Sequence, residues 1–224
     1  MQALGLNGKT ELLYTMEELA DRYNAEIINN DPVGPYALAG YSFGGLLAYE
    51  MAKRLIEMGK EVKMVGILDT YAGGKDKDVG IAEKVYKKVI RQFKKINFFS
   101  RLLIRNPKET INYQVVVLKR KIKRLFGSKV VAYDKVFLYE DEILRSYDIA
   151  WKNYLMQPLD IHVDVFRTQK RIYFLDDMVY LGWRKYAKKG ITVHEVPGDH
   201  KTFLFPPNDK EFADILQKVL DSKQ

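Results

Sequence analysis

The chain has 224 residues, of which 47% are hydrophobic and 29% charged, a composition that can bury the core of one large domain. It has no cysteine, which excludes disulfides and thiolate metal sites, and its three histidines are too few to suggest a metal cage. No leader with a basic then apolar region begins it, and no apolar run is long enough to cross a membrane. We therefore expect a cytoplasmic protein without metal or cofactor.

The net charge of +8 is concentrated in one segment. Residues 75–135 hold 18 Lys and Arg against five Asp and Glu, a net charge of +13, so the rest of the chain is acidic. Basic residues spread over the chain, or interleaved with exposed aromatic residues, would indicate nucleic-acid binding, and this distribution does not. We assign the basicity to one insert and expect no nucleic-acid partner.

Residues up to Asp69 alternate between helix and strand patterns. The expected elements are, in order, a helix over 16–28, a strand over 36–39, a helix over 44–58 and a strand over 62–68. Thr15 is placed as the N-cap of the first helix, with Glu18 three residues further on. Gly59 is placed to end the second helix.

From residue 75 to 157 we predict a helical insert, because no strand pattern appears. Two apolar stripes at helical spacing lie opposite Lys and Arg and are separated by Asn106-Pro107, and the second ends at Gly127. The stripes consist of Val85, Val89, Phe93, Ile96, Phe99 and Leu103, then Ile111, Val115, Leu118, Ile122 and Leu125. A further short helix is expected over 147–156.

Strand and helix patterns alternate again after the insert. The expected elements are a strand over 161–166, a helix around 178–188 capped by Gly190, a strand over 191–196 and a helix over 212–220. Alternation on both sides of a helical insert predicts a mostly parallel α/β sheet flanked by helices, with a lid. The whole chain, 1–224, is predicted to form this single domain.

The segment Gly40-x-Ser42-x-Gly44 follows an apolar strand and leads directly into a helix, which is typical of a nucleophile elbow. A serine that attacks a carbonyl must stand clear of its sheet on a sharp, strained turn. We expect the flanking positions to be too crowded for a Cβ, a demand that Gly40 and Gly44 would meet. The backbone N–H of Phe43 would donate to the oxyanion.

Asp69 is predicted to share a sheet edge with Ser42. The two strands that precede them are joined by a crossover and are therefore parallel, so both end at the edge where ligands bind in open α/β sheets. A loop aspartate that caps a turn is the alternative. Asp176 and Asp177 are reserve candidates for a catalytic carboxylate, because some α/β-hydrolases place it after a later strand.

His200 is the histidine best placed to act as a base. It follows the strand 191–196 through a short loop and so lies at the carboxyl edge, whereas His162 and His194 fall within strand patterns and are interpreted as structural. The order Ser42, Asp69, His200 matches the chain order of α/β-hydrolases. In that mechanism His200 takes the proton of the serine and Asp69 orients the imidazole.

Three segments of the chain resemble the thioesterase domains of nonribosomal peptide and polyketide synthases. They are GPYALAGYSFGGLLAYEMAKRL, ILDTYA and LGWRKYAKKGITVHEVPGDH, and the likeness extends over nearly the whole chain outside the insert. The resemblance implies the α/β-hydrolase fold with Ser42, Asp69 and His200 as the triad. It also implies release of an acyl or peptidyl chain from the phosphopantetheine arm of a carrier protein, by water or by an internal nucleophile.

The start of the chain departs from this family pattern. MQALGLNGKTE resembles a segment that in the family follows the first strands and a His-Gly-rich oxyanion loop, so we expect those strands and the second oxyanion donor to be missing. Losing one such donor typically costs about 10²- to 10³-fold in rate. We favour truncation of the fold over a weak enzyme.

Other functions fit parts of the same pattern. A general esterase or lipase could use the triad, and a remnant without turnover could keep only the contact with a carrier protein. The basic amphipathic helices of the insert could bind an anionic membrane surface, but we favour a lid whose lysines and arginines attract an acidic carrier protein.

Overall fold

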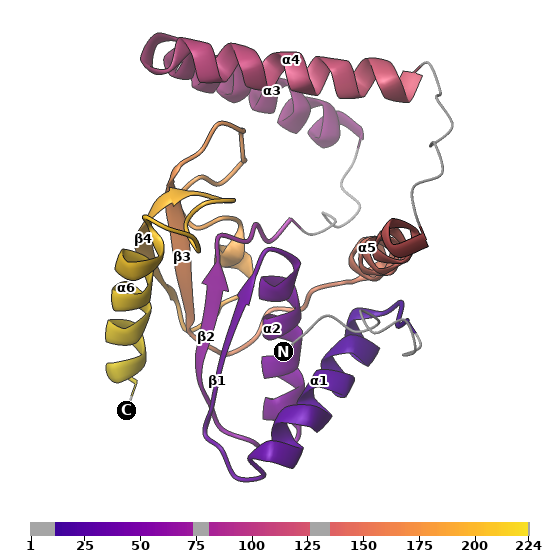
Figure 1. Cartoon of the computed structure of the whole chain (residues 1–224), viewed down its shortest axis with the longest axis vertical. Helices are drawn as coiled ribbons and strands as arrows, with labels where there is room; N and C mark the ends of the chain where they lie inside the picture. The colour runs from indigo at the N-terminus through magenta and orange to yellow at the C-terminus, as the bar shows by residue number, and fades with distance from the viewer. Residues whose placement is uncertain (1–11, 74–80, 126–134, 224) are drawn as a thin grey trace.

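A parallel sheet forms the centre of the molecule, as Figure 1 shows. The structure is a computed structural model and describes residues 12–73, 81–125 and 135–223. The strands, hydrogen-bonded in this order and all parallel, are β1 (Tyr36–Tyr41), β2 (Val62–Leu68), β3 (Val163–Lys170) and β4 (Ile191–Asp199). The predicted α/β class is confirmed, and every strand ends at the same edge of the sheet.

Helices cover both faces of this sheet. The helices α1 (Met16–Asn30) and α2 (Phe43–Glu57) pack on one face through a large apolar core, and α6 (Asp209–Asp221) packs on the other (Figure 1). Thr15 caps α1, since its hydroxyl accepts the N–H of Glu18 at 3.1 Å and donates to the carboxylate of Glu18 at 2.7 Å. The N-cap at Thr15 is the one that the sequence predicted.

The basic segment between β2 and β3 is helical. It contains α3 (Ile81–Arg105), α4 (Pro107–Leu125) and α5 (Lys135–Asn153), and Figure 1 shows α3 and α4 side by side above the carboxyl edge of the sheet. Gly127, where the second predicted helix was expected to end, lies outside the described residues. The bounds 75–157 of the insert stay a prediction, because its expected start falls within residues 74–80, which lie outside the described ranges.

The apolar stripes of α3 and α4 are largely open to solvent rather than buried in the body of the protein. Phe93 is 71% exposed and Ile96 is 66% exposed, for example. Part of each stripe lines a groove of about 620 Å³ between the two helices, at Ile96, Phe99, Leu103, Ile111 and Leu118 among other residues. Helix α3 contacts the segment that follows β3 through other residues. Phe98 packs on Phe174 with ring centroids 5.8 Å apart, and Arg91 pairs with Asp176 at 3.0 Å.

Helix α5 differs from its predicted extent of 147–156, because it begins at Lys135 and ends at Asn153. Beyond its end, Tyr154 leaves the helical path and its hydroxyl donates to the buried carboxylate of Glu50 in α2 at 2.5 Å. The ring of Tyr147 stacks on Phe43 with centroids 4.6 Å apart. These contacts attach α5 to α2, so tertiary packing sets where this helix ends.

The helix predicted around 178–188 is wrong. The structure has only a single 3-10 turn there, η1 (Trp183–Lys185). The carboxylate of Asp177 accepts three backbone N–H groups of the following turn at 2.9 to 3.2 Å, and Leu181 and Gly182 adopt left-handed φ values of 50° and 81°. An aspartate that holds the backbone N–H groups in a turn competes with helix formation, and left-handed residues interrupt a right-handed helix.

Candidate active site

Ser42 lies on the sharp turn between β1 and α2. Its φ of 54° and ψ of −121° are rare for a residue with a side chain, and such strain persists only where neighbours enforce it. Its N–H donates to the carbonyl of Leu68 at 3.3 Å, and its own carbonyl accepts the hydroxyl of Thr70 at 2.8 Å. The turn is thus tied to β2, and the serine projects from the carboxyl edge of the sheet.

Close packing around this turn requires glycine at positions 40 and 45. A Cβ on Gly40 would lie 1.9 Å from the carbonyl oxygen of Gly44, and a Cβ on Gly45 would lie 2.4 Å from Oγ1 of Thr70. Gly44 has nothing within 4 Å of a Cβ, so the expectation of crowding at Gly44 is wrong. The helix turns the Cβ direction of Gly44 away from the strand and that of Gly45 toward Thr70.

Asp69 directly follows β2 and is 2% exposed. Its Oδ1 accepts the N–H of Thr168 at 3.0 Å and a short hydrogen bond from Nη2 of Arg171, whose side chain is also buried. Its Oδ2 lies 2.9 Å from Nδ1 of His200. The carboxylate therefore joins the ends of β2, β3 and β4.

These partners determine the charge of Asp69. Burial by itself raises the pKa of a carboxyl, because it penalises the charged form. Against this, the hydrogen bond from His200, the positive charge of Arg171 and the N–H of Thr168 together hold the pKa of Asp69 below its usual range. Asp69 is consequently ionised at neutral pH in spite of its burial.

His200 comes directly after β4, which extends to Asp199 and so is longer than the predicted strand. The hydroxyl of Tyr41 donates to the His200 carbonyl at 2.6 Å, and the two rings lie 4.8 Å apart. The carboxylate of Asp199 accepts the N–H groups of Lys201 and Thr202 at 2.8 and 3.1 Å. The backbone of His200 is thus held from both sides.

Ser42, Asp69 and His200 line one cleft of about 360 Å³ at the carboxyl edge, together with Phe43 and Tyr173. The structure brings the carboxylate and the imidazole into hydrogen bonding. In the part of the chain that it describes, no hydrogen bond joins Oγ of Ser42 to His200. Such contacts are commonly long in unliganded sites and tighten with substrate.

The reserve aspartates and the other histidines have different partners. Asp177 caps the turn described above, and Asp176 pairs with Arg91 of α3. His194 in β4 bonds to Asp164 at 2.9 Å, and His162, just before β3, bonds to Thr192 at 2.9 Å. All four are accounted for by structural contacts away from Ser42.

Phe43 is the first residue of α2, so its N–H is among those at a helix start that have no partner within the helix. A second cleft, of about 550 Å³, runs beside β1 and is also lined by Ser42 and Phe43. β1 is an edge strand of the described sheet. The expected absence of earlier strands and of a second oxyanion donor stays a prediction, since residues 1–11 lie outside the described ranges.

Three residues that contact the candidate triad were not found from the sequence: Arg171, Thr168 and Tyr41. Arg171 and Thr168 lie at the carboxyl end of β3, at the sheet edge where Ser42 and Asp69 were expected. Their place in the predicted strand order could therefore have identified them as candidates. Lys170 lies there too and is exposed. In the fold, Arg171 is the buried one of these two adjacent cations.

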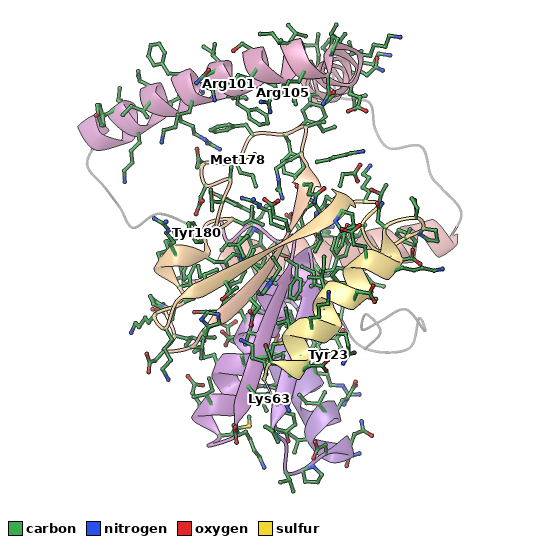
Figure 2. The ribbon with its side chains drawn as sticks, turned by 90° about the vertical axis from the view of Figure 1, so that its left-hand side faces the viewer. Tyr23, Lys63, Arg101, Arg105, Met178 and Tyr180 are labelled. Atoms are coloured by element: carbon green, nitrogen blue, oxygen red, sulfur yellow. The ribbon has the colours of Figure 1, made fainter. Side chains whose placement is uncertain are left out.

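Figure 2 shows Arg101 and Arg105 of α3 above the loop that carries Met178. This loop and α3 enclose a further cleft of about 560 Å³, whose lining includes Lys94, Arg101, Arg105 and Met178. Among the described residues, no helix is long and apolar enough to cross a membrane, and no cluster of His, Asp and Glu could hold a metal ion.

Comparison with known proteins agrees with this architecture. The family model described as "Thioesterase domain" matches residues 1–220. The nonribosomal peptide synthetase atqA of Aspergillus terreus is 29% identical over 230 residues, which cover 92% of this chain and 23% of that protein. The vanchrobactin synthetase VabF of Vibrio anguillarum is 28% identical over 220 residues, covering 93% of this chain and 7% of that protein. The chain thus spans a quarter or less of these relatives.

The fold is shared with solved thioesterase domains. The NocB thioesterase domain, crystallised as a covalent complex with a fluorophosphonate analogue of nocardicin G, superposes with a TM-score of 0.62 at 22% identity. The match covers 96% of this chain and 80% of that one. At this identity the likeness concerns the fold.

Proposed function

Because this chain belongs to the thioesterase domain family, we propose that it releases an acyl or peptidyl chain from the phosphopantetheine arm of a carrier protein, in nonribosomal peptide or polyketide biosynthesis. The observation that carries this proposal is the 2.9 Å contact between Asp69 and His200 in the cleft that also holds Ser42. A strained serine, an imidazole and a buried ionised carboxylate together form the machinery for acyl transfer.

In the proposed first step, Oγ of Ser42 attacks the thioester carbonyl while Nε2 of His200 accepts the serine proton. Asp69 keeps Nδ1 of His200 protonated and stabilises the imidazolium. The carbonyl oxygen becomes an oxyanion, to which the N–H of Phe43 donates. The C–S bond then breaks, the departing sulfur takes the proton from His200, and the acyl group is left on Ser42.

In the second step, His200 takes a proton from water or from a nucleophile within the acyl chain, and that oxygen or nitrogen attacks the ester on Ser42. The C–O bond to the serine breaks, and Oγ recovers its proton from the imidazolium. Water yields a free acid, and an internal nucleophile yields a ring.

Substitution of the nucleophile tests this function. We expect Ser42→Ala to lower hydrolysis of an acyl-pantetheine thioester by about 10⁴-fold or more, and to abolish labelling by a fluorophosphonate. Ser100→Ala is a matched control, because Ser100 lies on α3, where its hydroxyl donates to the carbonyl of Asn97. Unchanged turnover in Ser42→Ala would contradict the proposal.

The same assay separates the alternatives. Faster turnover of oxygen esters than of thioesters of the same acyl group would favour an esterase or lipase. Folded wild-type protein that neither turns over thioester nor reacts with fluorophosphonate would favour a remnant without catalysis.

A further inference from the structure

The carboxylate of Asp69 has a second charged partner besides His200. The side chain of Arg171 is 5% exposed, and its Nη2 donates to Oδ1, the oxygen that also accepts the N–H of Thr168. Oδ2 is left for Nδ1 of His200. Each carboxylate oxygen thus has its own partners, so the carboxyl group cannot rotate without breaking contacts on both.

Arg171 is itself held in one place. Its Nη1 donates to the hydroxyl of Tyr173 at 2.9 Å, and the guanidinium carbon lies 4.9 Å from the centre of the Tyr173 ring. Burial raises the pKa of Tyr173 to about 12, and the nearby charge of Asp69 also acts to raise it. The phenol is therefore neutral at neutral pH. Tyr173 therefore fixes the guanidinium without competing for its charge.

We propose that Arg171 is a positioning residue: it fixes the Asp69 carboxylate toward His200 and offsets part of its negative charge, so that loss of this cation would strengthen the attraction between Asp69 and an imidazolium at His200. The inference rests on the proposed function for its kinetic consequence. The physical reason for the inference is electrostatic. A cation that pairs with the Asp69 carboxylate weakens the attraction that an unpaired Asp69 would exert on the imidazolium of His200.

The other ionisable groups around this pair do not provide the same balance. Tyr41 faces His200, and burial, with Asp69 and Asp199, raises its pKa, so it stays neutral. The carboxylate of Asp199 is negative and bonds to backbone N–H groups. Among the described residues, the ion pairs of Asp69 are those with Arg171 and His200.

The test compares Arg171→Met, Arg171→Lys and Arg167→Met. Methionine keeps much of the side-chain volume but has no charge, and lysine keeps the charge. Arg167 is the matched control, because it is an arginine of β3 that pairs with a different carboxylate, that of Glu195. Its Nη1 donates to the carbonyl of Met178 at 3.0 Å.

For Arg171→Met we expect the acid limb of the kcat/KM profile to move up by about one pH unit, and kcat at its plateau to fall about tenfold. Arg171→Lys should keep the wild-type acid limb. Arg167→Met should lower thermal stability without moving that limb. An acid limb of Arg171→Met that coincides with wild type, or moves to lower pH, would overturn the inference.

A measurement that needs no turnover keeps this test separate from the proposed function. The titration of the His200 ring, followed by NMR in wild type and Arg171→Met, should show the same upward displacement. If the wild type proves inactive but this displacement is found, the proposed function fails and the inference about Arg171 stands. If the wild type is active and the His200 titration does not move, only the inference fails.

Discussion

Asp69 and His200 are separated by 131 residues in the sequence, yet Oδ2 of one lies 2.9 Å from Nδ1 of the other. They meet because β2 and β4 run parallel on either side of β3, so residues that directly follow these strands come to the same edge. Helices α3, α4 and α5 intervene in the sequence between them but leave this geometry intact.

Replacing Asp69 by Asn should lower kcat by roughly 10³- to 10⁴-fold, because an amide fails to hold the correct tautomer of His200. The folded pKa of Asp69 is depressed, so its contribution to stability is fully present above about pH 4 and is lost as pH falls through the folded value. The difference in Tm between wild type and Asp69→Asn should therefore be largest near neutral pH and narrow below about pH 4.

Asp177→Asn is the control for this experiment. Its carboxylate caps a backbone turn, so we expect a lower Tm with kcat within about twofold of wild type. If Asp177→Asn abolished turnover and Asp69→Asn did not, the catalytic carboxylate would follow a later strand.

Tyr41→Phe should lower kcat about tenfold. Its hydroxyl donates to the carbonyl of His200 at 2.6 Å, so its loss frees the backbone that presents the imidazole. Tyr36→Phe is a matched control on the same strand, because its hydroxyl donates to the carbonyl of Asp31, also at 2.6 Å. Both variants should lose about 1 kcal/mol of stability in urea unfolding, and only Tyr41→Phe should lose rate. Equal rates in both would show that Tyr41 does not position His200.

The two adjacent glycines of the elbow helix should respond oppositely to alanine. Gly44→Ala has free space for its methyl group and should raise the free energy of unfolding by up to about 1 kcal/mol, through helix propensity. Gly45→Ala would push against Thr70, which bonds to the carbonyl of Ser42, so we expect a loss of about 1–3 kcal/mol and slower fluorophosphonate labelling. Equal effects of the two changes would refute this account of the packing.

The basic residues of α3 that line the cleft beside Met178, namely Lys94, Arg101 and Arg105, should speed the association with an acidic carrier protein. We expect Lys94→Glu/Arg101→Glu to lower kcat/KM for a carrier-bound thioester by about tenfold at low salt, and less at high salt, because salt screens the attraction. The same assay with a free acyl-pantetheine should show a small change.

Lys210→Glu/Lys218→Glu makes the same change of charge on α6, which packs against a face of the sheet whereas α3 and α4 lie above its carboxyl edge, and should have little effect. If the α3 variant left the carrier-bound rate unchanged but abolished cosedimentation of the protein with anionic vesicles, the basic helices would serve a membrane surface instead.

The sequence by itself determined the elbow, the strand before it, the helix after it and the order Ser42, Asp69, His200. These are local properties, because apolar runs, turn glycines and the residue that ends a parallel strand depend on near neighbours in the chain. The predicted strand 62–68 has the bounds of β2. The N-cap of α1 at Thr15 could be predicted for the same reason.

Only the tertiary structure decided which groups complete the site. Arg171 turns inward to Asp69 while its neighbour Lys170 is exposed, and Gly45 rather than Gly44 faces Thr70. The tertiary structure also decided that residues 178–188 do not form the predicted helix. There the carboxylate of Asp177 accepts backbone N–H groups of a turn. In each case two neighbouring residues or two hydrogen-bonding arrangements are equally compatible with the local sequence. Contacts with residues that are distant in the sequence, or the packing around them, determine which one the fold adopts.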